Sequence, residues 1–263
     1  MKTIYQALAA IEENQETAAL ATIVRSRGST PRHGASKMLI YADGSTLGTV
    51  GGGELEHRVV NEALESMQDG EPRYLTYNMS DPAKGDPGIC GGTVEIFVEP
   101  ILPNPTLLLV GAGHVGKAVA HLAKWLGFRV VIVEDRAERC TPEQIPGGDE
   151  YLPVPMDEIV EHVQVNAQTY IVLTTRGADV DAIALPALLE SAAPYLGVIG
   201  STRRWAATAN LLQERGVPKA QIQRVHSPIG LDIQAETPEE IALSIMAEIL
   251  MLRHGGTGKK LSH

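Results

Sequence analysis

The stretch that decides the fold runs from Thr106 to Asp135 and reads TLLLVGAGHVGKAVAHLAKWLGFRVVIVED. Two apolar runs, 107–110 and 130–133, flank a glycine turn that is followed by an amphipathic segment. This order of patterns predicts a strand, a tight turn, a helix and a second strand. Such a unit is typical of a Rossmann-like sheet, in which parallel strands alternate with helices.

The turn holds three glycines with separate steric roles: Gly111, Gly113 and Gly116. The first permits the tight turn, the second lets a pyrophosphate approach the backbone, and the third lets helix and strand pack closely. The acids Glu134 and Asp135 end the second strand, about 20 residues beyond the turn, where a carboxylate usually binds a ribose. We therefore predict a nucleotide site, although the same glycines also serve packing alone.

Composition and charge narrow the class of protein. The chain has 263 residues, of which 44% are hydrophobic, so it can bury two modest cores. Its net charge of −10 argues against a nucleic-acid partner. We expect no membrane association and a cytoplasmic location, because no apolar run reaches about 18 residues and the N-terminus lacks a signal-peptide pattern.

Two cysteines, Cys90 and Cys140, are too few for a disulfide framework or a four-cysteine zinc site. The sequence also lacks HxxxH, CxxC and carboxylate clusters at metal-ligand spacing, which predicts no zinc or iron site. Each cysteine is therefore judged as a free thiol. Cys140 is treated as structural.

The first hundred residues predict a mixed α+β domain. A helix over the first fifteen residues and a helix over 55–67 accompany strands at 18–24, 37–41, 73–78 and 93–99. An Asp-Gly turn at 43–44 predicts a hairpin. The segment from Arg25 to Arg32 is predicted to be a loop, and its three arginines and three hydroxyls suit an oxyanion as well as they suit a solvated hairpin.

Two further segments in this half have candidate functional residues. Gly51, Gly52, Gly53 and Glu54 precede a predicted helix, which suits either a ligand-binding turn or a flexible start to the helix, and we favour the ligand. Cys90 is followed by Gly91 and Gly92 at the end of a Pro/Gly-rich loop. We interpret Cys90 as an accessible, working thiol rather than an inert core residue.

The run PILPNP at 100–105 predicts a linker, with its stiff part at 101–105, and marks a domain boundary. A Rossmann-like doubly wound domain is predicted over 106–254, with strands at 150–154, 169–174 and 195–199 and a helix over 156–163. A final helix begins with a capping box at Thr237. The tail 255–263 is predicted to be disordered.

Three loops of this domain follow strands at the same edge of the predicted sheet, namely 111–116, 174–181 and 200–205. Ligands of parallel sheets bind beyond the carboxyl ends of the strands, so the three loops predict one site. Besides the glycines of the turn, they contribute the candidate residues His114, Gly200, Ser201 and Arg203. A lone histidine such as His114 is more often a surface or packing residue than a chemical one.

Six motifs together resemble a known family. They are Gly28-Ser29-Thr30-Pro31-Arg32, Gly51-Gly52-Gly53-Glu54, Cys90-Gly91-Gly92, GAGHVG at 111–116, Gly200-Ser201, and PIGLD at 228–232 with TPEEIA at 237–242. In this order they are similar to the XdhC/CoxI proteins, the accessory factors of xanthine dehydrogenase and related molybdenum hydroxylases.

The resemblance implies a chaperone that binds the molybdenum cofactor (molybdopterin, in a simple or a dinucleotide form). Such proteins help a cysteine desulfurase place a sulfido ligand on molybdenum and deliver the cofactor to an apo-hydroxylase, usually as homodimers. Cys90 would then be the molybdenum ligand or sulfur carrier. The cofactor's pterin phosphate or dithiolene end would be held by the residues Arg25, Arg27, Ser29, Thr30, Arg32 and Gly51 to Gly53. The Rossmann turn would bind a nucleotide.

This chain departs from the family pattern at two positions. Ala178 stands where many relatives have the histidine of a TRGHxxD motif, and Gln234 stands where relatives tend to have glycine. Two other classes also agree with the Rossmann pattern: an NAD(P)-dependent oxidoreductase and a nucleotide-binding regulatory protein.

Overall fold

The computed structural model describes residues 3–28, 35–79 and 91–262. The chain divides into two compact units, Met1–Pro103 and Asn104–His263. The division falls within the segment 101–105 that the prolines mark in the sequence. Each unit has its own sheet and its own hydrophobic core.

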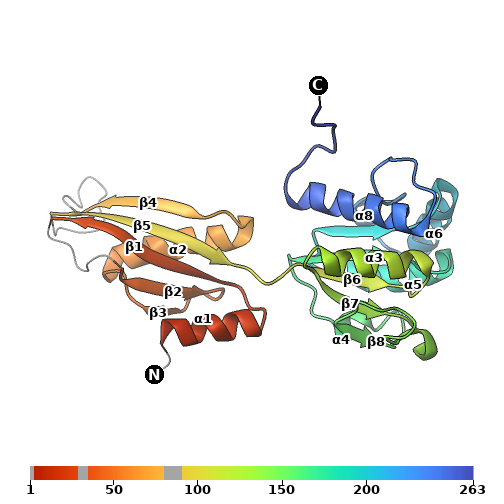
Figure 1. Cartoon of the computed structure of the whole chain (residues 1–263), viewed down its shortest axis with the longest axis horizontal. Helices are drawn as coiled ribbons and strands as arrows, with labels where there is room; N and C mark the ends of the chain where they lie inside the picture. The colour runs from red at the N-terminus through yellow and green to blue at the C-terminus, as the bar shows by residue number, and fades with distance from the viewer. Residues whose placement is uncertain (1–2, 29–34, 80–90, 263) are drawn as a thin grey trace. The chain divides into compact units, whose positions relative to one another are not determined.

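In its described residues, the first unit is an antiparallel sheet with one helix on each face (Figure 1). Its strands follow the order β3-β2-β1-β5-β4, with the bounds β1 Ala18–Arg27, β2 Lys37–Tyr41, β3 Thr46–Gly48, β4 Arg73–Asn78 and β5 Thr93–Ile101. Helix α1 spans Ile4–Glu13 and α2 spans Gly53–Asp69. Because side chains alternate along a strand, Ala19, Ala21 and Ile23 pack towards α2 while Ala18 packs towards α1.

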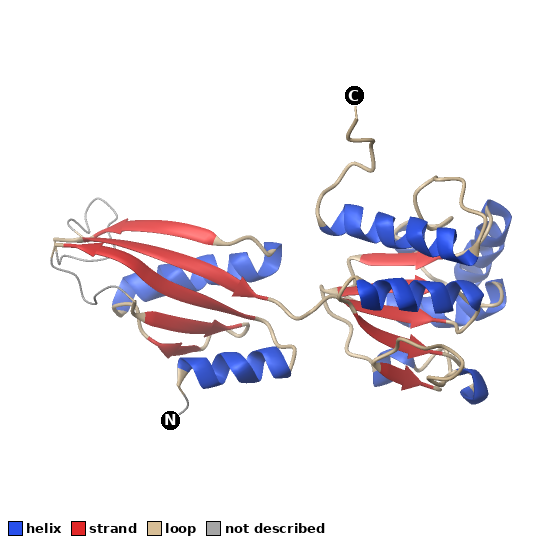
Figure 2. Ribbon diagram, in the orientation of Figure 1, coloured by secondary structure: helices blue, strands red, loops and turns tan. Residues whose placement is uncertain are grey.

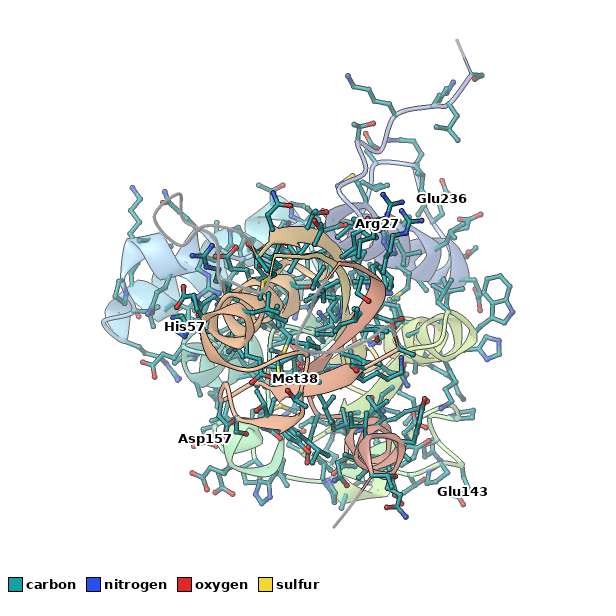
Figure 3. The ribbon with its side chains drawn as sticks, turned by 90° about the vertical axis from the view of Figure 1, so that its left-hand side faces the viewer. Arg27, Met38, His57, Glu143, Asp157 and Glu236 are labelled. Carbon is teal, nitrogen blue, oxygen red and sulfur yellow. The ribbon has the colours of Figure 1, made fainter. Side chains whose placement is uncertain are left out.

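The core under α2 is mainly apolar, with Ser66 as the buried polar residue of the helix. Leu55, Val59 and Ala63 of the helix are buried against Met38 and its neighbours on the sheet. Met38 lies inside this unit, whereas Arg27 lies on its surface (Figure 3).

Two sequence predictions for this unit were wrong in detail. The predicted loop beginning at Arg25 is strand up to Arg27, because Arg25 to Arg27 continue the ladder with β5 beyond a register shift after Ile23. Likewise, Pro100 pairs with Ala19 and Ile101 with Ala18, so β5 runs on into the proline-rich segment. The predicted helix and strand types are otherwise confirmed.

The second unit is a parallel five-stranded sheet covered by helices on both faces (Figure 2). The strand order is β10-β9-β6-β7-β8, with the bounds β6 Thr106–Val110, β7 Arg129–Val133, β8 Glu150–Leu152, β9 Thr169–Leu173 and β10 Tyr195–Val198. The order reverses between β6 and β9, which is the switch point where ligands of doubly wound sheets bind. The predicted Rossmann-like fold is confirmed.

Six helices and a short 3-10 turn are described in this unit: α3 His114–Trp125, η2 Ala137–Arg139, α4 Ile159–His162, α5 Ala178–Leu189, α6 Thr202–Glu214, α7 Lys219–Ile222 and α8 Pro238–Arg253. Helices α3 and α8 pack on one face of the sheet, and α4, α5 and α6 pack on the other. The predicted capping box at Thr237 is present, and its hydroxyl accepts from the Glu240 amide. The predicted helix over 156–163 is shortened to one turn.

Within the described residues, no helix combines the length and apolar character needed to span a membrane.

Candidate functional site

A cavity lies at the carboxyl ends of β6, β7 and β9, beside the switch point of the parallel sheet. Its volume is about 190 Å³. Its lining comes from the glycine turn, the segment after β7, the segment after β9 and one methionine: Gly111, Ala112, Gly113, Glu134, Arg136, Arg139, Met156, Thr174, Thr175 and Arg176. Two of the three loops that the sequence assigned to one site therefore meet around one cavity.

The three glycines of the turn separate into two kinds. A Cβ on Gly111 would lie 2.7 Å from the Thr174 carbonyl oxygen, and one on Gly116 would lie 2.4 Å from the Gly111 carbonyl oxygen. These two are required for packing. Gly113 has an ordinary φ of −81°, and its Cβ would meet Thr174 only at 4.0 Å. Packing does not explain Gly113, so the space beside it is available to a ligand.

Gly113 is the N-cap of α3 and offers no side chain to the amides of the first turn. No acidic residue stands in that turn, and the first residue, His114, is exposed. The Ala112 amide before this helix end is bonded to the Glu134 carboxylate, but the amides of the first turn itself are uncapped, and such a helix end attracts anions. The turn therefore has the chemistry of a phosphate site.

Glu134, the predicted ribose ligand, is buried with 1% of its surface exposed. One carboxylate oxygen accepts from the Ala112 amide at 2.9 Å and from Nη2 of Arg136 at 3.0 Å. The other accepts from Nε of Arg136 at 2.6 Å and from its amide at 3.4 Å. The carboxylate thus ties the glycine turn to the segment after β7.

Asp135 points to a different arginine. Both of its oxygens accept from the Arg176 guanidinium, at 2.8 and 2.7 Å. This fork lowers the pKa of Asp135 to about 2, against the opposing effect of partial burial. The pair links the loop after β7 to the loop after β9.

A buried ion pair supports the loop after β9. Asp181 is fully buried and accepts from Arg204 at 2.7 and 3.1 Å. Thr175 donates to the same carboxylate at 2.5 Å, and its own oxygens accept from Arg204. A buried charge needs such partners, so this network fixes where Thr175 and Arg176 lie.

The third predicted loop serves mainly this support. Gly200 has a φ of +143°, and its Cβ would lie 2.7 Å from the Arg204 side chain. Ser201 caps α6 by accepting from the Arg204 amide. Arg203, the arginine that the sequence favoured, is exposed, and its neighbour Arg204 makes the buried contacts. Arg203 and Arg204 point in different directions because they lie at different positions around α6. The pattern of a predicted loop does not reveal these directions.

Sequence reasoning also missed Arg136, Arg139 and Arg176. Arg136 and Arg139 lie one and four residues after Asp135, and Arg176 lies within the predicted site loop 174–181. Their cationic type was the available signal, because an acidic chain needs local cations to hold an anion.

Gln234 has a φ of +57°, in the left-handed region that favours glycine. This explains why a glycine suits the position in relatives. Here the Gln234 side chain donates to Asp232 at 2.6 Å and closes the turn.

In the first unit, the glycine turn at 51–53 already holds an anion from its own chain. Glu56 accepts from the amides of Val50, Gly51 and Gly52 at 3.1, 3.3 and 2.9 Å, and from the Thr49 hydroxyl at 2.5 Å. The predicted ligand-binding amides of Gly51 and Gly52 are therefore hydrogen-bonded internally. Gly53 and Glu54 begin α2, and Glu54 pairs with Arg58 at 3.0 Å.

The described ends of two further motifs, Gly28 and Gly91-Gly92, meet in this unit. A Cβ on Gly28 would lie 3.1 Å from Gly92 and 3.2 Å from the Gly91 oxygen, so the ends of two motifs are in contact. Arg25 pairs with Glu95 at 3.4 Å on the neighbouring strand, and Arg27 is exposed. Ser29, Thr30, Arg32 and Cys90 lie outside the described residues.

Cys140 is buried and donates to the Ile132 oxygen, and burial raises the pKa of its thiol. Across residues 3–28, 35–79 and 91–262, no group of three or more His, Cys, Asp or Glu side chains is placed to hold a metal ion.

Comparison with known proteins decides the family. The model described as the XdhC Rossmann domain matches residues 107–249, and the model described as the XdhC and CoxI family matches residues 11–78. The chain belongs to the XdhC and CoxI family. The family resemblance of the six sequence motifs is thereby confirmed.

Several relatives extend this result. The chain is 37% identical over 268 residues to Escherichia coli YqeB, covering 99% of this chain and 48% of YqeB. It is 32% identical over 161 residues to a Bacillus subtilis protein named as a probable xanthine dehydrogenase subunit, covering 61% and 47% of the two chains. This XdhC-family chain spans about half the length of these two relatives.

A third relative is the Escherichia coli molybdenum cofactor insertion chaperone PaoD, 24% identical over 265 residues, covering 90% of this chain and 83% of PaoD. Among solved structures, one described as a xanthine dehydrogenase from Bacillus halodurans superposes with a TM-score of 0.52. It is 23% identical and covers 98% of this chain and 97% of its own. This likeness supports the fold.

Proposed function

We propose that this XdhC-family chain is a molybdenum cofactor chaperone that binds molybdopterin and inserts it into an apo molybdenum hydroxylase of the xanthine dehydrogenase type. Family membership supports this function, as does the name of its relative PaoD, a molybdenum cofactor insertion chaperone. The Bacillus subtilis relative, named for xanthine dehydrogenase, supports the class of client.

The structural observation that supports it best is the free phosphate site at the start of α3. Molybdopterin ends in a phosphate, and the space at Gly113 together with the uncapped amides suits such a group. The bound cofactor would supply a molybdenum centre that accepts soft sulfur ligands. The chain's own part is to bind the phosphate and to supply a thiolate.

Cys90 is the residue that we assign to the metal or to sulfur transfer. A thiolate is needed for either role, and the buried Cys140 is unsuited because burial raises the pKa of its thiol. Gly91 and Gly92, the residues after Cys90, contact Gly28 near the exposed Arg27. We infer that Arg27 and the residues 28–32 bind the dithiolene end of the cofactor, that a cysteine desulfurase supplies the sulfur, and that the protein acts as a homodimer.

The test compares Cys90→Ser with Cys140→Ala as the matched control. Each protein is purified from molybdenum-replete cells, checked for folding by thermal unfolding, and assayed for bound molybdenum and for activation of an apo-hydroxylase. We expect Cys90→Ser to lose both and Cys140→Ala to keep both. Unchanged molybdenum and unchanged activation in Cys90→Ser would remove Cys90 from the mechanism.

The alternative, an NAD(P)-dependent oxidoreductase, is favoured by the same glycine turn and parallel sheet. The small molecule that is released when the purified protein is denatured separates the candidates. Oxidised pterin supports the chaperone, NAD(P) supports the oxidoreductase, and a simple nucleotide supports a nucleotide-binding regulatory protein.

A further inference from the structure

The cavity at the switch point does not match a nucleotide whose ribose has free hydroxyls. A carboxylate recognises such a ribose by accepting from both hydroxyl groups, and it has about four acceptor positions in all. At Glu134 four donors already fill them: the Ala112 amide and the Nε, Nη2 and amide groups of Arg136. Because Glu134 is buried, a ribose diol would have to displace an arginine from it.

The charges around the cavity favour an anion instead. Arg136, Arg139 and Arg176 all line it. Two of these guanidinium groups are balanced by Glu134 and Asp135, at 2.6 and 2.7 Å. Arg139 is exposed, and its guanidinium makes no hydrogen bond or ion pair to the rest of the described chain. Three cations against two carboxylates leave one positive charge in a protein whose net charge is −10.

The glycine turn and this arginine cluster together offer two anion sites on one cavity. The first consists of the amides at the start of α3, beside Gly113, and the second consists of Arg136, Arg139 and Arg176. A guanidinium fork matches a phosphate better than any neutral group. A ligand with two phosphate groups, one at each end of a ribose, would satisfy both sites.

We propose that this cavity binds a nucleotide that has an additional phosphate on its ribose, as in the adenosine half of NADP, and discriminates against the same nucleotide with a free diol. Arg136 and Arg139 determine this specificity. Arg136 contributes to the specificity in two ways. It occupies the Glu134 carboxylate, which then cannot accept from a ribose diol, and it adds positive charge to the cavity. A dinucleotide form of the molybdenum cofactor, whose ribose lacks this additional phosphate, is then the poorer ligand of this cavity.

The inference rests on the proposed phosphate site at Gly113 and not on molybdenum transfer. The test therefore uses protein made without molybdenum and measures binding of two probes by calorimetry: adenosine 2′,5′-bisphosphate and adenosine 5′-monophosphate. They differ only in the ribose phosphate. We expect the bisphosphate to bind about tenfold more tightly or better, the effect of one charge-assisted hydrogen bond, and the preference to weaken with added salt.

Three variants assign the effect. Arg139→Ala, an exposed position, should reduce the preference for the bisphosphate severalfold without affecting folding. Arg136→Ala should remove most of the preference and improve binding of the monophosphate, because it frees Glu134, and its thermal unfolding is checked because it uncovers a buried carboxylate. Arg129→Ala is the control, because Arg129 starts β7 at the opposite edge of the sheet and pairs with Glu150.

Equal affinity for the two probes, tighter binding of the monophosphate, or no binding of either would overturn the inference. So would an unchanged preference in both Arg136→Ala and Arg139→Ala. None of these results affects the molybdenum content or hydroxylase activation that test the chaperone function, so the two proposals fail separately.

Discussion

Two glycine-rich turns in this protein each lead into a helix, and they differ in the groups that accept hydrogen bonds from their backbone amides. The turn at 51–53 precedes α2, and Glu56, four residues after the N-cap, fills it with a carboxylate from the same helix. The turn at 111–116 precedes α3, where Lys117 occupies the corresponding position four residues after the N-cap. A glycine turn before a helix therefore offers backbone amides as hydrogen-bond donors. The residue one helical turn later determines whether a carboxylate of the same helix occupies these amides or whether they are open to an anionic ligand.

The pKa of Glu56 shows that the turn at 51–53, the filled turn, stabilises the charged form of this carboxylate. Burial raises the pKa of Glu56, but hydrogen bonds from the Thr49 hydroxyl and from three amides outweigh this effect, and the net result is a lowered pKa. The charged carboxylate is therefore part of the folded state. The turn before α3 has no carboxylate from its own helix, although Glu134 accepts from its Ala112 amide, and we propose that the uncapped amides at the start of α3 bind phosphate.

The largest expected effect is on the buried ion pair that supports the loop after β9. Arg204→Ala would leave the buried Asp181 carboxylate without its cation and should destabilise the second unit by about 3–5 kcal/mol. Urea unfolding measures this loss. The exposed neighbour gives the control, since Arg203→Ala should change the free energy of unfolding by less than about 0.5 kcal/mol. Similar effects of both variants would contradict the assignment of the buried pair.

The turn at 111–116, the open turn, has glycines that serve packing and a glycine that we assign to binding, and substitutions can separate these two roles. Gly116→Ala places a Cβ 2.4 Å from the Gly111 oxygen and should cost about 1–3 kcal/mol of stability. Gly113→Ala meets its nearest atom only at 4.0 Å, so it should leave stability nearly unchanged and weaken phosphate binding. Denaturation and nucleotide titration of both variants are the measurements. Equal destabilisation would mean that Gly113 also serves packing.

The filled turn should respond to removal of its internal charge. Glu56→Gln loses charge-assisted hydrogen bonds and should destabilise the first unit by about 1–2 kcal/mol at pH 7. Since folding lowers the pKa of Glu56, its contribution is complete above the unfolded pKa of about 4.3 and disappears as the pH falls through the lower folded value. Unfolding of the wild type should therefore become easier below about pH 4, and the variant should lose less over that range.

The smallest expected effect is at the rim of the open cavity. Asp135→Asn breaks a partly exposed ion pair with Arg176 and should cost less than about 1 kcal/mol at pH 7. Because folding lowers the pKa of Asp135 to about 2, this contribution is present above about pH 4 and lost between about pH 4 and 2. The pH dependence of thermal unfolding in wild type and variant checks the sign. A variant that gains stability at pH 7 would contradict it.

The fold followed from patterns that are local in the sequence. Apolar runs and glycine turns placed the described strands of both sheets to within a few residues, except the short β3, which only the Asp-Gly turn implied. The site was harder, because it depends on which side chains face each other across loops. Glu134 was recognised, but its occupation by Arg136 two residues later was not, since an arginine after a strand can as well point to solvent. Glu56 was missed because the glycines before it suggested an external anion.

The central claim is that this chain binds the molybdenum cofactor, and the most direct test is the pterin content of the purified protein. Wild type and Gly113→Ala are isolated anaerobically from molybdenum-replete cells, and oxidised pterin and molybdenum are counted per chain. The account predicts pterin and molybdenum in equal amounts on the wild type and less of both on the variant. Wild-type protein that has no pterin, under conditions in which the client hydroxylase acquires its cofactor, would contradict it.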